Sequence, residues 1–274
     1  MQLVEYLKSN LPRGLFERAL KLIYLVNLAE QKEVKKYQII KSILKNKFIQ
    51  NGQYTLTNYG VWMLTNYSDR TFRLACIGYR NRLENILQQI KQPMIFLDIG
   101  ANQGIFSLVA AKNKFFKQIH AFEPNPNLCK ILEKNLLRNK VEKFKIYSYA
   151  INKYNGSSYL SIPTDHSGAG QITKKSNNSI KVFCKNRFYL NQQFRDLDLP
   201  IFLKIDVEGM EFTVIHEVLA SVLVQKVKFI FVELSGTNSK KNNTIKLLLN
   251  SGFRESFRRS RGIDDALFEN MKLS

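Results

Sequence analysis

From residue 93 onward, short apolar runs alternate with helical patterns, and this alternation restricts the fold more than any other feature of the chain. Five runs have the length and composition of buried strands: MIFLDIG, QIHAFEP, FKIYSYAI, IFLKIDVEG and KFIFVELSG. Between them, apolar residues recur every three or four positions, as Leu128, Ile131, Leu132 and Leu136 do. Strands that alternate with helices require right-handed crossovers. The pattern therefore predicts a parallel sheet with helices on both faces.

Both ends of the chain depart from this alternation. At the C-terminal end, GFRESFRRS and DDALFEN flank Gly262 and predict a final pair of strands that adds an antiparallel edge to the sheet. Residues 1–92 predict a mainly helical leader, because LFERALKLIYLVNLAEQ and RLACIGYRNRLENILQQI have amphipathic helical spacing. The polar NGQYTLTNYG between them predicts a short hairpin or loop. We expect a leader or cap over 1–92 and an α/β domain over 93–274.

The composition is that of an ordinary globular protein. Apolar residues make up 45% and charged residues 23% of the chain, and every apolar run is shorter than the roughly 18–20 residues of a membrane helix. The cysteines Cys76, Cys129 and Cys184 have no metal or redox spacing, and the N-terminus has no signal-peptide pattern. A cytoplasmic protein is expected.

The charge is the unusual part of the composition. Lys and Arg number 42 against 22 Asp and Glu, which gives a net charge of +20. Such an excess suggests an acidic partner: nucleic acid, an anionic membrane surface or a polyanionic substrate. Residues 1–93 carry 15 basic and 6 acidic residues, and the remainder carries 27 and 16. Because the excess is spread over the chain, we do not expect nucleic acid to be the partner.

Acidic residues and glycines gather where the predicted strands end. In an open parallel sheet, ligands bind at the carboxyl ends of the strands, and these ends read DIGANQG, EPNP, AIN, DVEG and ELSG. Gly100 and Gly104 let the backbone turn tightly and approach a ligand. The turn matches neither the dinucleotide fingerprint nor the P-loop, which argues against both ligands. Glu123 ends the next strand, where a carboxylate can accept hydrogen bonds from two ribose hydroxyls.

Four segments, LDIGANQGIFSLVAA, AFEPNP, FLKIDVEGME and FVELSG, resemble in their order and spacing the FkbM family of class I S-adenosylmethionine-dependent methyltransferases. The resemblance covers roughly Thr71 to the C-terminus, and IDVEGME is its most distinctive part. It implies a Rossmann-like, doubly wound α/β fold whose seven-stranded sheet has an antiparallel last strand. It also implies S-adenosylmethionine as the cofactor and O-methylation of hydroxyls on sugars or natural products.

The resemblance further implies positions around the cofactor. The residues that would line the methionine part are Asp98, Gly100, Ala101, Asn102 and Gly104. Glu123 would hold the ribose, and Ala150 and Ile151 would lie near the adenine. Asp206, at the end of the fourth strand, is a further candidate for a cofactor contact.

Proton acceptors for a hydroxyl substrate follow the fourth strand. Attack by a hydroxyl leaves a proton to remove, so a base is useful. Asp206 is the first candidate and Glu208 the second. His166, in the glycine-rich segment TDHSGAGQI, is the third, because the pKa of histidine suits the task. As alternatives, Glu208 and Glu211 cap the following helix, and His166 is a solvated loop residue. Glu233, after the fifth strand, lies on the same rim.

Two other functions stay open. A 2′-O RNA methyltransferase would suit the charge and the cluster of Arg254, Arg258, Arg259 and Arg261. The motifs of exocyclic-amine and C5 methyltransferases are missing, however. A non-catalytic binding protein with the same fold is the other alternative, against which the acidic residues at every cofactor position argue.

No metal is expected, since no His, Cys and Asp cluster has zinc spacing and nothing in the chain demands Mg²⁺, although Asp206 and Glu233 are of the type that binds it. The expected partner is a small molecule or glycan with a hydroxyl group. The sequence carries no signature of an oligomeric state.

Overall fold

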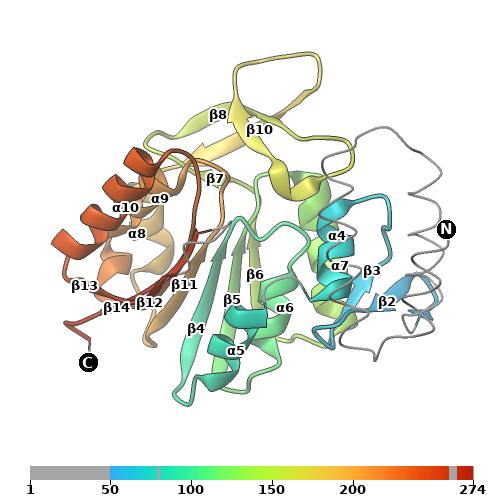
Figure 1. Cartoon of the computed structure of the whole chain (residues 1–274), viewed down its shortest axis with the longest axis horizontal. Coiled ribbons are helices and arrows are strands. Elements are labelled where there is room, and N and C mark those ends of the chain that lie inside the picture. The colour runs from blue at the N-terminus through green and yellow to red at the C-terminus, as the bar shows by residue number, and fades with distance from the viewer. Residues whose placement is uncertain (1–49, 79–80, 259–263, 274) are drawn as a thin grey trace.

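The computed structural model describes residues 50–78, 81–258 and 264–273. The helix predicted within residues 15–31 lies outside this part, as do Arg259 and Arg261. The centre of the molecule is a seven-stranded sheet with the order β13-β14-β12-β11-β4-β5-β6 (Figure 1). Its strands are β4 (Met94–Ile99), β5 (Phe116–Phe122), β6 (Phe144–Tyr147), β11 (Ile201–Ile205), β12 (Val227–Leu234), β13 (Phe253–Arg258) and β14 (Asp264–Asn270).

The sheet confirms the predicted class of fold. Strands β6, β5, β4, β11 and β12 run parallel to one another, and the last strand, β14, is antiparallel to both β12 and β13. The predicted final pair of strands is confirmed as an antiparallel edge: β13 is the outermost strand, and β14 lies between it and β12. Helix α10 (Asn238–Asn250) crosses from β12 to β13 one position further out, which leaves the gap that β14 fills.

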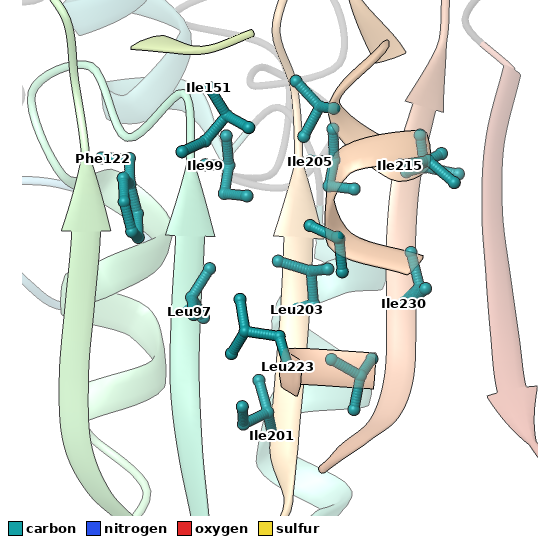
Figure 2. Close-up of a cluster of buried hydrophobic side chains, with 14 of the residues drawn as sticks. Leu97, Ile99, Phe122, Ile151, Ile201, Leu203, Ile205, Ile215, Leu223 and Ile230 are labelled. Atoms are coloured by element: carbon teal, nitrogen blue, oxygen red, sulfur yellow. The ribbon is translucent and has the colours of Figure 1, made fainter. Parts of the chain in front are cut away.

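Helices cover both faces of this sheet. Alternate residues of each strand point to opposite sides, so Phe96 and Phe202 face one core and Leu97 and Leu203 face the other. The first core is closed by α5 (Asn81–Gln89), α6 (Ile105–Ala111) and α7 (Pro126–Arg138). The second is closed by α8 (Arg187–Phe194), α9 (Glu211–Leu219), η2 (Val222–Gln225) and α10. Figure 2 shows this second layer: Leu97, Leu203 and Ile230 come from three neighbouring strands and belong to the same buried cluster.

The described part of the leader packs on the first core. Strands β1 (Gln50–Asn51), β2 (Tyr54–Leu56) and β3 (Trp62–Leu64) form a small antiparallel sheet, which confirms the predicted hairpin and extends it by one strand. The helical pattern that follows is divided by Gly78, with φ of +72°, into α4 (Arg70–Ile77) and α5. The side-chain oxygens of Asn135 and Asn139 of α7 accept hydrogen bonds from backbone N–H groups of β3. The boundary at residue 92 stays a prediction.

A second sheet lies over the carboxyl ends of the central strands (Figure 1). We call it the cover sheet; it has the order β7-β10-β8-β9. Its elements are β7 (Ala150–Ile151), β8 (Gly156–Ser161), the short helix η1 (Ser167–Ala169), β9 (Gln171–Thr173) and β10 (Ser179–Lys185).

The cover sheet corrects one prediction. The segment FKIYSYAI was expected to be one strand, but residues 144–147 belong to the central sheet and residues 150–151 pair with β10. The glycine-rich segment TDHSGAGQI, residues 164–172, forms a turn that contains η1 and leads into β9. The segment GSSYLS is too polar to predict a strand from its sequence. In the structure only Leu160 of this segment is buried. Packing over the central sheet selects the strand conformation.

Within the described residues, no helix is both long enough and apolar enough to cross a lipid bilayer.

The ends of β4 and β11 meet so closely that Gly100 has no room for a side chain. The Asp206 N–H donates to the Ile99 carbonyl at 3.0 Å. A Cβ atom on Gly100 would lie 1.8 Å from the Asp206 carbonyl oxygen, and its φ of +80° is in the left-handed region. The fold itself therefore requires this glycine, independently of any ligand.

We predict that Gly100→Ala lowers the free energy of unfolding by about 3–5 kcal/mol, because left-handed strain and a backbone clash add together. Gly52→Ala is the matched control: φ is +62°, but nothing lies within 4 Å of a Cβ there. It should cost only about 1 kcal/mol, the strain alone. Urea denaturation of both variants measures the difference, and equal losses would contradict the close approach of the two strand ends.

Candidate active site

A cavity of ≈440 Å³ lies at the carboxyl ends of the central strands, beneath the cover sheet. Its walls come from the glycine turn after β4, the end of β5, the turn after β11, the cover sheet and the first turn of α4. The sequence-predicted residues that line it are Gly100, Ala101, Asn102, Glu123, Ala150, Ile151, His166, Asp206 and Glu208. The structure thus brings together all the candidates except Asp98 and Gly104.

Asp98 and Gly104 lie behind the cavity wall. Asp98 is fully buried, and its carboxylate accepts a hydrogen bond from the Ser107 hydroxyl at 2.7 Å. Gly104 precedes α6 with φ of +87°, and a Cβ there would lie 2.1 Å from Leu132 Cδ1. Both residues shape the wall from behind, and neither is among the residues that line the cavity.

Glu123 is held by backbone N–H groups from two turns. Its Oε2 accepts from the Asn102 N–H and its Oε1 from the Asn125 N–H, each at 2.9 Å. Burial raises the pKa of Glu123 to about 7, against the opposing effect of these N–H groups and of the Lys204 charge. A carboxylate offers about four lone-pair sites, so about two remain for a ligand. This is the number that two ribose hydroxyls need.

The glycine turn is pinned to the carboxylate that it faces. Asn102 has φ of +51°, a left-handed conformation that asparagine tolerates better than most residues. This conformation lets its N–H reach Glu123 while its side-chain oxygen accepts from the Gln103 N–H at 2.8 Å. The turn is therefore fixed before any ligand binds.

The part of the cavity near Glu123 is apolar. Its lining there includes Phe122, Leu128, Tyr149 and Ile151. Flat apolar walls suit an adenine ring, Glu123 suits a ribose, and the backbone of the glycine turn suits a polar tail. The residues present therefore fit S-adenosylmethionine.

Lys204 is a site residue to which the sequence analysis gave no role. It lies opposite Asp98 in the pairing of β4 with β11, and its side chain is 3% exposed. The ammonium donates to the Gly100 carbonyl at 2.8 Å and lies 2.9 Å from Asp98 Oδ1 and 3.8 Å from Asp206 Oδ2. A charge so deeply buried requires such partners. The sequence does hold a signal for this residue, because a lysine stands inside the apolar run IFLKI.

A second unpredicted network fastens the cover sheet over the cavity. Asp69 begins α4 and is 5% exposed. Its carboxylate accepts from the Ser167 N–H at 2.8 Å, from the Ser167 hydroxyl at 2.7 Å, and from the Gln103 side-chain amide. Next to it, the Thr71 hydroxyl accepts from the Gly168 N–H at 2.8 Å. The leader, the glycine turn and the cover sheet thus meet at one carboxylate.

Several proton acceptors line this cavity together. Asp206 and Glu208 follow β11, and Glu233 lies near the end of β12. His166 comes from the cover sheet and is half-buried. Burial lowers the pKa of His166 below its ordinary value, and the nearby positive charge of Arg70 lowers it further. The imidazole is therefore mainly neutral at pH 7 and able to accept a proton.

Other titratable residues have structural partners. Glu211 is buried and accepts from the Gly209 N–H at 2.9 Å and from the Ser235 hydroxyl, so it joins the start of α9 to the end of β12. His120 lies on β5 and stacks on Tyr147. Among the described residues, no group of three His, Cys, Asp or Glu side chains is placed to hold a metal ion.

The sequence matches a known protein family. A model of the methyltransferase FkbM domain matches residues 98–256, more than half of the chain. None of the curated proteins matches the sequence.

Solved structures with a similar fold include the O-methyltransferase from Bacillus cereus in complex with SAH, with a TM-score of 0.44 and 11% identity over 70% of this chain and 79% of that one. The ribosomal protein L11 methylase from Lactobacillus delbrueckii subsp. bulgaricus gives 0.42 and 11% over 70% and 79%. The M. jannaschii tRNA m1G37 methyltransferase gives 0.44 and 15% over 79% and 56%. At these identities and TM-scores, nothing further about this chain follows from the similarity.

The family match spans the glycine turn, Glu123, the carboxylates after β11 and Glu233 near the end of β12, which line the cavity described above. The chain therefore belongs to the FkbM methyltransferase family, and it is an S-adenosylmethionine-dependent methyltransferase.

Proposed function

We propose that the protein methylates a hydroxyl oxygen of a sugar, a glycan or a natural-product small molecule. The observation that supports this most is the set of proton acceptors in the cofactor cavity itself: Asp206, Glu208, Glu233 and His166 all line it. A hydroxyl must lose its proton when it is methylated, and a base beside the reacting oxygen accelerates that step.

In this proposal several elements of the chain each bind one part of the cofactor. S-adenosylmethionine supplies a methyl group on a positively charged sulfur when it is bound. Glu123 accepts the ribose hydroxyls, and Ala150 and Ile151 of the cover sheet pack near the adenine. The residues that line the methionine part are Gly100, Ala101 and Asn102. Asp98 and Gly104 support that turn from behind. Residues 93–274 form the catalytic domain, and residues 1–92 act as its cap.

Asp206 is the proposed base, with Glu208 and His166 as the alternatives. Lys204 lies 3.8 Å from the Asp206 carboxylate and is itself anchored on Asp98 and the Gly100 carbonyl. The lysine thereby holds Asp206 at a defined place relative to the glycine turn. We expect most of the rate enhancement to come from positioning: the acceptor oxygen is held in line with the methyl group, and the base is held beside that oxygen.

RNA is the second candidate acceptor, favoured by the net charge of +20. Part of the arginine cluster that suggested it has internal partners: Arg254 pairs with Glu269 at 2.9 Å and Arg258 with Glu255. A screen that follows labelled methyl transfer into hydroxylated sugars, glycans, polyketide alcohols and RNA separates the candidates. Incorporation into RNA alone would reject the hydroxyl small-molecule proposal.

Affinity for S-adenosylhomocysteine should depend on pH through Glu123. The pKa of Glu123 is about 7 in the free protein. The ionised form, which accepts hydrogen bonds from the ribose hydroxyls, therefore predominates above pH 7 and is lost below it. The dissociation constant should rise about tenfold from pH 8 to pH 6. Calorimetry measures it; Glu123→Gln should bind more weakly at pH 8 and lose the pH dependence. Glu133→Gln, an exposed change on α7, is the control, and an unchanged profile in Glu123→Gln would refute the ribose contact.

Asp206→Asn should lower kcat about 10²–10⁴-fold, because asparagine has nearly the same shape but is a far poorer base. The dissociation constant of S-adenosylhomocysteine should change little. The exposed Asp196→Asn serves as the control. Unchanged turnover would move the base to Glu208 or His166, and weaker binding at an unchanged maximal rate would make Asp206 a cofactor ligand.

A further inference from the structure

Arg70 brings a positive charge from the leader into the cofactor cavity. It is the first residue of α4, it is half-buried, and it lines the cavity. Burial lowers the pKa of His166, and the charge of Arg70 lowers it further, so the guanidinium lies near that imidazole. The family match begins only at residue 98, and the sequence analysis gave Arg70 no role.

The start of α4 is fastened against the glycine turn. Asp69, the residue before Arg70, accepts a hydrogen bond from the Gln103 side-chain amide. The Ser167 hydroxyl lies 2.7 Å from Asp69 Oδ2 and 3.0 Å from Asn102 Oδ1. Arg70, Asn102 and Ser167 all line the cavity. The arginine therefore enters the cavity beside the glycine turn.

The cover sheet fixes the backbone of Arg70 from the other side. The Arg70 N–H donates to the Asp165 carbonyl at 2.7 Å, and the neighbouring Thr71 hydroxyl accepts from the Gly168 N–H at 2.8 Å. The backbone is thus held between two turns that both line the cavity. Because of this, only the side chain of Arg70 has to be ordered when a ligand binds.

The lining of the cavity is otherwise rich in negative charge. Among the described residues that form it, the cationic side chains are Arg70 and Lys204, and the carboxylates are Glu123, Asp206, Glu208 and Glu233. The ammonium of Lys204 has three N–H donors, and it lies among the Gly100 carbonyl, Asp98 and Asp206. Arg70 is therefore the side chain placed to balance a further negative charge.

The cofactor itself carries such a charge. S-adenosylmethionine ends in an amino acid whose carboxylate is ionised at pH 7. In the arrangement proposed above, this end lies at the glycine turn, beside which Arg70 enters. The carboxylates of the cavity would repel it unless a cation lies close. A guanidinium has five N–H donors in a fork that matches a carboxylate, so it can bind this group in addition to its contacts within the protein.

We propose that Arg70 binds the methionine carboxylate of S-adenosylmethionine, which makes the leader a part of the cofactor site. A site built around this contact rejects a cofactor that lacks the carboxylate, because the buried guanidinium would lose its partner. The inference rests on the proposed arrangement of the cofactor and does not depend on the identity of the methyl acceptor.

Calorimetry of the full chain with two ligands tests this. Decarboxylated S-adenosylhomocysteine keeps the adenine, the ribose and the amino group and lacks only the carboxylate. Arg70→Gln should weaken the binding of S-adenosylhomocysteine about 10–100-fold, the loss expected for charge-assisted hydrogen bonds. It should change the affinity for the decarboxylated ligand by less than about twofold. Arg70→Lys, which keeps the charge but not the fork, should restore part of the affinity.

The unaltered chain gives a measurement that does not depend on the folding of any variant. It should bind S-adenosylhomocysteine at least about tenfold more tightly than the decarboxylated ligand. Equal affinity for the two ligands would mean that no side chain recognises the carboxylate, which would overturn the proposal.

Two controls accompany the variants. Arg195→Gln removes an exposed arginine at the end of α8, outside the cavity, and should leave both affinities unchanged. Glu123→Gln, measured at pH 8, should weaken both ligands alike, because both contain the ribose. Unchanged binding of both ligands in Glu123→Gln would overturn the proposed arrangement of the cofactor itself, a failure that is distinct from one at Arg70.

Two results with Arg70→Gln would overturn the assignment. Equal weakening of both ligands would mean that Arg70 only supports the shape of the site. Unchanged affinity for S-adenosylhomocysteine would exclude the carboxylate contact, and a lower kcat/KM for the acceptor in that case would assign the guanidinium to an anionic group of the acceptor. The binding measurements need no methyl acceptor, so they stand apart from the hydroxyl methylation proposed above.

Discussion

The ammonium of Lys204 joins the first and fourth strands of the parallel sheet at the point where the active site begins. It lies between Asp98 and Asp206 and donates to the carbonyl of Gly100. Burial makes each charge dependent on the others, because removal of one partner would leave an unpaired charge in the interior. The glycine turn and the turn after β11 are therefore placed as a unit.

The same constraint explains the electrostatics of the cavity. Asn102 follows the turn that Lys204 anchors, and its N–H is directed at Glu123. Glu123 is almost entirely buried, which makes its negative charge costly. Backbone N–H groups and the nearby charge of Lys204 offset part of this cost. Hydrogen bonds donated by ligand hydroxyls would stabilise this buried charge further. The cofactor site is thus preorganised, with little left to order on binding.

The cover sheet gives the cavity its other wall. Its inner side chains, Leu160 and Ile172 among them, line the cavity, and Asp69 holds its η1 turn by Ser167. One small sheet therefore closes the cofactor cavity, and a buried carboxylate at the start of α4 fastens it there.

Local patterns along the chain determined the class of the fold and the main residues of the site. Runs such as MIFLDIG and IFLKIDVEG are apolar on both sides, which only a covered parallel sheet satisfies. Because parallel strands end on one edge, the acidic and glycine residues after them had to gather there. This reasoning placed Gly100, Asn102, Glu123 and Asp206 in one cavity, where the structure has them.

Tertiary packing decided the rest. The Asp69 contact to Ser167 joins positions 98 residues apart, and no periodicity connects them. The strands of the cover sheet are short and polar, so they are stable only against the sheet that they cover. The reason that Gly100 must be glycine is the Asp206 carbonyl, 106 positions further along the chain and 1.8 Å from a Cβ there. A sequence pattern reports which face of an element is apolar, whereas distances between remote backbones arise only when the elements pack.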